Sequence, residues 1–86
     1  MTFEVLTNLR PEEVIERAAA FYRERSRLEE IEHGDGSITF QGRPGTARIH
    51  AHRHYSHTTV RAETDRGVGL DVTDLTLRFL YTIPHV

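Results

Sequence analysis

With 86 residues the chain has room for one small hydrophobic core, so we expect a single α+β domain over residues 1–86. It contains no cysteine, and its eleven basic residues are all arginines, which excludes disulfides, thiolate metal sites, thiol nucleophiles and Schiff-base chemistry. Residues 1–36 contain nine acids and five arginines, and residues 37–86 contain four acids and six arginines. This charge asymmetry is too mild for a dedicated nucleic-acid binder.

The chain shows no sign of a membrane segment or a leader. No run approaches the ~20 apolar residues that cross a bilayer, and the first residues lack the regions of a signal peptide. We therefore expect an unprocessed cytoplasmic protein that has no membrane partner. Because a core of this size buries little apolar surface, we also expect the chain to associate with itself as a homo-oligomer.

The first two elements are a strand and a helix. Residues 2–7 alternate apolar and polar side chains, which predicts a strand with one face inward. Pro11 suits the first turn of a helix, and Glu12 and Glu13 suit its positive end, so a helix is predicted over residues 11–25. Its predicted inner stripe follows helical spacing and consists of Val14, Ala18, Phe21 and Arg25, flanked by Ile15 and Tyr22.

Four further strands are predicted in a meander. Residues 27–33 alternate imperfectly, which indicates a bulge, and Gly34-Asp35-Gly36 predicts a turn because glycine takes positive φ at little cost. The next strands are predicted at 37–42, at 47–55 and at 58–63, and each of the last two has one apolar and one polar face. In the third of the four, Tyr55 is expected on the inner face.

The C-terminal segment fits two structures. Leu75, Leu77, Phe79, Tyr81 and Ile83 alternate as in a strand, whereas a second stripe through Val72 and Leu80 fits a helix. We favour a helix over residues 71–82, because a second helix would cover core area that one helix cannot. The expected fold is β-α-β-β-β-β-α, an antiparallel sheet with two helices packed on one face.

This order of elements resembles a single TATA-binding-protein-like repeat, and also a reduced form of the helix-grip fold of START-like ligand carriers. Two segments are similar to those of small bacterial proteins of uncharacterised role: Arg10-Pro11-Glu12-Glu13-Val14 and Arg78-Phe79-Leu80-Tyr81-Thr82-Ile83-Pro84. The first resemblance implies an open sheet face that meets nucleic acid. The second implies a ligand held between helix and sheet, although a chain with fewer strands is not expected to enclose a large cavity.

His50, His52 and His54 are the candidate metal ligands. They fall at alternate positions of one predicted strand, so their imidazoles point the same way at a Cα spacing of about 6.8 Å. A pair of them could hold zinc with a third ligand, His57 or Glu63. The same pattern fits a pH-dependent interface, and it fits a solvated polar face, which is the interpretation that we favour.

Three arginines complete the set of candidate binding residues. Arg48 and Arg61 are predicted to share the face of the histidines, where they could contact phosphates. Arg53 is predicted on the inner face, where it would pair with a carboxylate such as Glu30 unless a bulge turns it outward. No aromatic residue is predicted on the polar face, so nucleic acid is not the favoured partner.

The residues do not indicate an enzyme. The glycines follow no phosphate-loop spacing, and Ser56 and His57 are neighbours on a strand, so their side chains should point to opposite faces. We predict a non-enzymatic binding or assembly module that self-associates and has no cofactor. A small-ligand carrier, and a metal or nucleic-acid binder that uses the histidine and arginine face, are the alternatives; the sequence does not identify a ligand.

Overall fold

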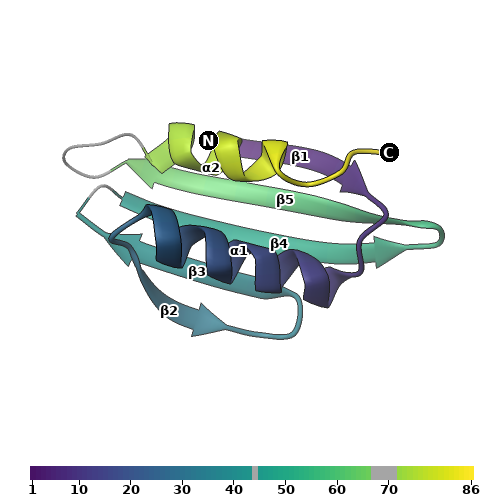
Figure 1. The fold of residues 1–86 in the computed structure, drawn as a ribbon, viewed down its shortest axis with the longest axis horizontal. Helices are drawn as coiled ribbons and strands as arrows, with labels where there is room; N and C mark the ends of the chain where they lie inside the picture. Colours follow the sequence, from purple (N-terminus) through teal and green to yellow (C-terminus); the bar gives the residue numbers. More distant parts are fainter. Residues whose placement is uncertain (44, 67–71) are drawn as a thin grey trace.

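The computed structural model describes residues 1–43, 45–66 and 72–86 and has the predicted order of elements (Figure 1). The elements are β1 (Thr2–Thr7), α1 (Pro11–Arg25), β2 (Glu29–His33), β3 (Ser37–Gly42), β4 (Gly45–His54), β5 (His57–Arg66) and α2 (Val72–Tyr81). The five strands form one antiparallel sheet in the order β1-β5-β4-β3-β2. The predicted α+β class is confirmed, and none of the described helices is long and apolar enough to span a membrane.

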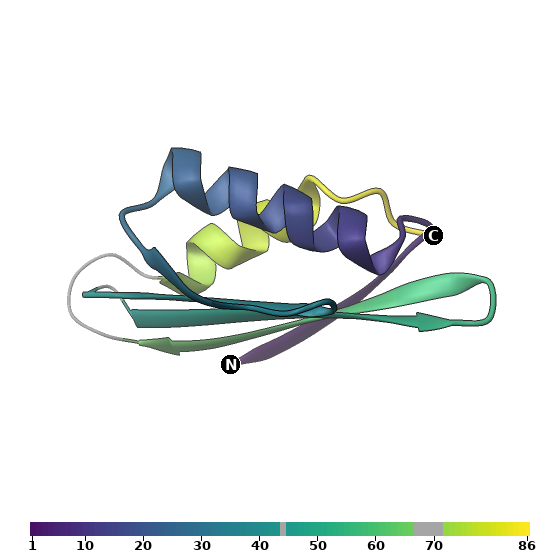
Figure 2. The same cartoon turned by 90° about the horizontal axis from the view of Figure 1, so that it is seen from below.

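Both helices lie on the same face of the sheet, and the other face is uncovered (Figure 2). The strand register explains which residues face the helices: the buried Ala62 of β5 lies opposite the buried Ile49 of β4, which lies opposite the buried Ile38 of β3. Because successive side chains of a strand alternate between faces, the polar residues between them point away from the helices. The alternation read from the sequence therefore places the core correctly.

Helix α1 begins where the sequence predicts. Pro11 occupies its first turn, and the backbone N–H of Arg10 donates to Glu13 Oε1 at 3.2 Å, which satisfies one of the free donors at the helix start. The predicted inner stripe is displaced, however. The buried residues of α1 are Val14, Ile15, Ala18, Ala19 and Tyr22. The face that meets the sheet is centred on these positions, which recur every three or four residues, and Phe21 and Arg25 lie to one side of it.

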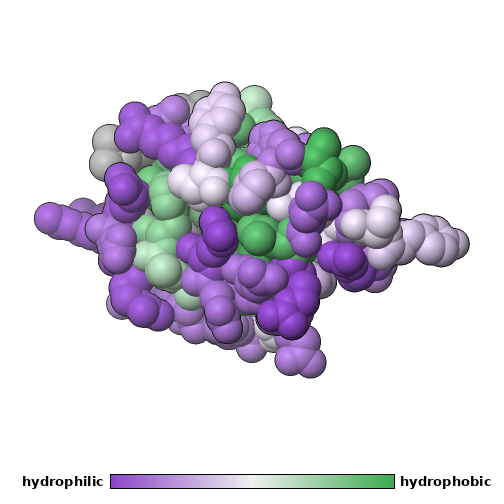
Figure 3. All heavy atoms as spheres, turned by 45° about the vertical axis from the view of Figure 1, so that its right-hand side comes forward, coloured by the Kyte–Doolittle hydropathy of each residue, from purple (hydrophilic) through white to green (hydrophobic). Residues whose placement is uncertain are grey.

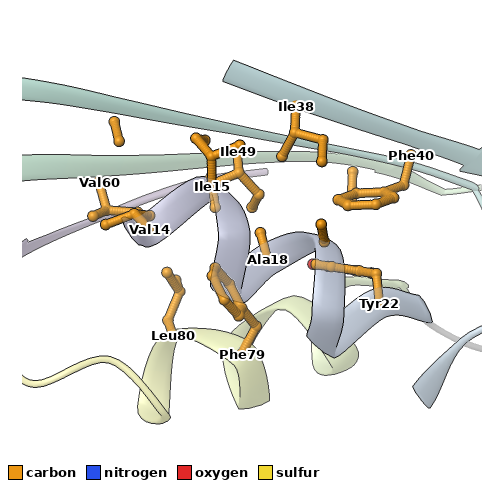
Figure 4. Packing of buried hydrophobic residues seen from close by; sticks show 14 of the residues in the cluster. Val14, Ile15, Ala18, Tyr22, Ile38, Phe40, Ile49, Val60, Phe79 and Leu80 are labelled. Carbon is orange, nitrogen blue, oxygen red and sulfur yellow. The ribbon is translucent and has the colours of Figure 1, made fainter. Parts of the chain in front are cut away.

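The ring of Tyr22 is the centre of the core. It stacks on Phe40 of β3 at 4.4 Å between ring centroids, and it lies 6.0 Å from Phe79 of α2 (Figure 4). Its hydroxyl shares a 2.5 Å hydrogen bond with Thr76 Oγ1, also on α2, so the polar end of the buried ring has a partner. Burial raises the pKa of Tyr22 to about 12, and the hydrogen bond with Thr76 opposes this shift.

The C-terminal segment is a helix, so the strand alternative is wrong. Its buried residues, Val72, Thr73, Thr76, Phe79 and Leu80, follow helical spacing. The hydroxyls of Thr64 and Thr73 lie 2.9 Å apart and join the helix start to the end of β5. The predicted start at residue 71 lies outside the described residues.

One local expectation for the edge of the sheet needs correction. Neither Gly34 nor Gly36 has a positive φ. Space is tight at Gly36, because a Cβ there would lie 3.0 Å from the carbonyl oxygen of Ala51, whose N–H donates to Gly36 O at 2.8 Å. Strand β2 has the predicted bulge, between Glu30 and Glu32, but all its side chains are exposed, Ile31 included. Elsewhere, small hydrophobic patches are visible among hydrophilic side chains (Figure 3).

Replacing Tyr22 with Phe should change how stability depends on pH. The folded chain retains the phenolic proton up to a pKa of about 12, against about 10 in the unfolded chain. The raised pKa of Tyr22 therefore contributes about 2–3 kcal/mol to the free energy of unfolding below pH 10. This contribution is lost as the pH rises to about 12. Urea unfolding of both proteins at pH 9 to 12 measures the difference. If the free energy of unfolding depended on pH in the same way in wild type and Tyr22→Phe, the raised pKa of Tyr22 would be contradicted.

Candidate functional site

The helices leave one face of the sheet uncovered, and this open face gathers all the predicted site residues except Arg53. Its side chains are Thr2, Glu4 and Leu6 of β1, His57, Thr59, Arg61, Glu63 and Asp65 of β5, Thr46, Arg48, His50, His52 and His54 of β4, and Ser37, Thr39 and Gln41 of β3. A shallow depression of about 460 Å³ crosses this face, lined by Glu4, His50, His52, His54, Thr59, Arg61 and Glu63. The prediction that Arg48, Arg61 and the three histidines share a face is confirmed.

The open face is of mixed charge, not basic. Arg61 lies between Glu4 of β1 and His50 of β4 in the register, and Arg48 lies opposite Glu63. His50 Nε2 is 3.1 Å from Glu63 Oε1, a diagonal contact between adjacent strands. Opposite charges in neighbouring positions stabilise a strand pair modestly. The carboxylates therefore offset the arginines that the sequence suggested as phosphate ligands.

Three imidazoles gather at the end of the β4–β5 hairpin. The ring centroids of His52 and His54 lie 4.7 Å apart, and those of His54 and His57 lie 6.5 Å apart. His57 comes from β5, directly opposite His54, because a two-residue turn joins the strands. Of the candidate ligands, His50 is bonded to Glu63 instead. Within the described parts of the chain, no three His, Asp or Glu side chains are arranged to hold a metal ion.

Arg53 lies on the helix side of the sheet but is exposed. It is opposite Thr58 in the register, and its Nη1 donates to Thr58 Oγ1 at 3.5 Å. The side chain stays in solvent because the hairpin extends beyond both helices (Figure 2). The predicted pairing with Glu30 is not formed, since Glu30 Oε2 lies 3.2 Å from His33 Nδ1.

Tyr55 is not an inward residue of β4 as expected. It is the first of the two turn residues between His54 and His57, and its side chain is 99% exposed. Tyr55 has a φ of 48° and Ser56 has no positive φ, which is the pattern of a type II′ turn. Glycine is the usual residue there, because other residues are strained at positive φ.

The interior between the helices and the sheet is filled at its centre. The stacked rings of Tyr22 and Phe40 fill the space between α1 and β3. Both residues are buried, and Ile38 and Ile49 beside them on the sheet are buried as well. A ligand at this position would have to displace side chains that form the core.

Comparison with known proteins gives no match: no family model, no curated protein and no solved structure matches the chain. The resemblance of its element order to TATA-binding-protein-like and START-like folds therefore stays a prediction.

Replacing Tyr55 with Gly should stabilise the protein. The side chain makes no buried contact, and glycine removes the cost of a positive φ, about 1 kcal/mol. Thermal unfolding should show a higher Tm for Tyr55→Gly than for wild type. Ser56→Gly is the matched control, because Ser56 lacks a positive φ and the change should not stabilise. A Tm lowered equally in both variants would contradict this account of the turn.

Proposed function

We propose that this chain is a non-enzymatic assembly module in which two copies pair through β1, joining their sheets and presenting their open faces as one binding surface. The observation that carries the proposal is the unpaired outer edge of β1. The paired copies form a C2 dimer, the commonest symmetry of soluble homo-oligomers.

The hydrogen bonds of the first residue define which backbone groups face the edge. Met1 N donates to Thr64 O at 2.7 Å, and Thr64 N donates to Met1 O at 2.8 Å. In an antiparallel ladder such doubly bonded pairs recur every second residue, so the N–H and C=O groups of Thr2, Glu4 and Leu6 point away from β5. Val86 N already donates to Leu6 O at 3.0 Å. The groups of Thr2 and Glu4 are thus available to another strand.

The two edge strands, β1 and β2, differ in the features that prevent pairing with another strand. Strand β2, at the opposite edge, carries three glutamates and a bulge between Glu30 and Glu32. Charges and bulges are the means by which natural sheets prevent pairing at an edge. Strand β1 has one acid, Glu4, and pairs with β5 over six positions without a register shift. The edge that can accept a second copy is therefore β1.

One register of self-pairing fits both faces of β1. If Thr2 of one copy bonds to Glu4 of the other, the two-fold axis passes between the two Phe3 residues, and each Met1 lies opposite Val5 of the second copy. These side chains point to the helix side, where Met1 is 76% exposed and Phe3 and Val5 are half-buried. The pairing extends the hydrophobic core across the interface, and Leu6 O keeps its hydrogen bond from Val86 N.

The open face supports a second candidate function, the binding of a small anion or a polynucleotide. Arg48 and Arg61 lie on the adjacent strands β4 and β5, and Arg61 lines the depression. The neighbouring Glu4 and Glu63 weaken attraction to phosphate, so this candidate ranks second.

Replacing Glu4 with Pro should separate the dimer without unfolding the subunit. Proline removes the outward N–H of residue 4, which has no partner among the described residues of one copy, and proline is tolerated at an edge strand for this reason. Sedimentation equilibrium should show a dimer for wild type and a rise of the dissociation constant by about tenfold or more for Glu4→Pro.

Glu4→Ala is the control, because it removes the carboxylate opposite Arg61 but keeps the backbone N–H of residue 4. It should remain dimeric. A wild type that stays monomeric up to about 1 mM, or equal weakening by both variants, would contradict pairing through the β1 backbone.

A further inference from the structure

We infer that His52, His54 and His57 form a binding site for a divalent transition-metal ion, zinc in the first place, at the end of the β4–β5 hairpin. This inference does not depend on the pairing of β1. It rests on the backbone geometry of the hairpin and on which of the six histidines form hydrogen bonds with other residues.

The backbone places the three side chains within reach of one ion. His52 and His54 are two apart on β4, about 6.8 Å between Cα atoms, and His57 lies opposite His54 beside the turn, about 5.5 Å away. All three point to the open face. The centroid separations of 4.7 and 6.5 Å show that neighbouring rings are already close. Zinc needs imidazole nitrogens at about 2.0–2.1 Å, which rings on such a triangle can supply.

The hydrogen bonds distinguish these histidines from the others. Among the described residues, His33 contacts Glu30, His50 contacts Glu63 and His85 Nε2 contacts the carbonyl oxygen of Leu80. The side chains of His52, His54 and His57 make ring contacts with one another and no hydrogen bond within the described chain. Metal binding at the hairpin end would therefore break no hydrogen bond, whereas ligation by His50 would compete with Glu63.

The nitrogens do not converge in the conformation described, in which no three ligand side chains are placed for a metal. Binding requires rotation about side-chain torsions into other staggered rotamers, and these rings have room to rotate because His52 and His54 are exposed and His57 is half-buried. Three imidazoles favour zinc, nickel or copper over calcium and magnesium, which prefer oxygen ligands. The fourth position of a tetrahedral ion stays open to water.

The test is titration of the untagged full chain with zinc chloride by isothermal calorimetry, with NMR of the imidazole carbon-bound protons. Wild type should bind one zinc ion per chain, and the resonances of His52, His54 and His57 should shift while those of His33 and His85 do not. One ion per two chains would mean that ions bridge hairpins, and it would overturn the site within one chain. An absence of binding would overturn it as well.

Four single substitutions assign the ligands. His54→Asn and His57→Asn should each weaken zinc binding by about tenfold or more, because each removes one of three ligands. His33→Asn, at the far edge of the sheet, and His50→Asn, beside the site, should leave the affinity within about twofold of wild type. All four side chains are exposed or half-buried, and circular dichroism verifies folding. An equal loss in His50→Asn and His57→Asn would overturn the assignment of His57.

Discussion

The ring of Tyr22 lies against Phe40 and within 6.0 Å of Phe79, so one side chain of α1 contacts both the sheet and α2. Its hydroxyl is bonded to Thr76 on the same face of α2. These contacts hold the two helices side by side over β3, β4 and β5, and they require that both lie on one face. The opposite face is left without a covering layer (Figure 2).

The described residues leave one face of the five-stranded sheet without helices (Figure 2). The uncovered face is polar, with Arg48 and Arg61 next to carboxylates, so it is stable in water without a further layer. At the edges, the acids and the bulge protect β2, while β1 keeps two residues whose backbone groups have no partner within the described chain. The proposed self-association through β1 would give these backbone groups partners.

The sequence predicts the elements well because their signals are local. Pro11 with two glutamates indicates the start of α1, and alternation separates the two faces of β4 and β5. The error in the stripe of α1 arises because Phe21 and Tyr22 are both apolar and only 100° apart on the helix, so spacing alone does not decide which one faces the sheet.

The candidate site depends on pairings that local patterns do not contain. Glu4 lies opposite Arg61 because β1 pairs with β5, which is distant in the sequence, so the mixed charge of the open face could not be read from the arginines and histidines of β4. His50 belongs to the alternating set His50-His52-His54 in the sequence, but its contact with Glu63 removes it. His57 joins the remaining two only because the turn is two residues long.

The paired edge and the histidine cluster are compatible in one molecule. Leu6 lies opposite Thr59, which lies opposite His52, so the cluster is near the C-terminal end of β1, whereas Thr2 and Glu4 lie toward its start. In an antiparallel pair the two β1 strands run in opposite directions, and the two hairpin ends therefore point to opposite ends of the joined sheet. Each ion would be held within one subunit and would leave the dimer contact unchanged, so either property can exist without the other.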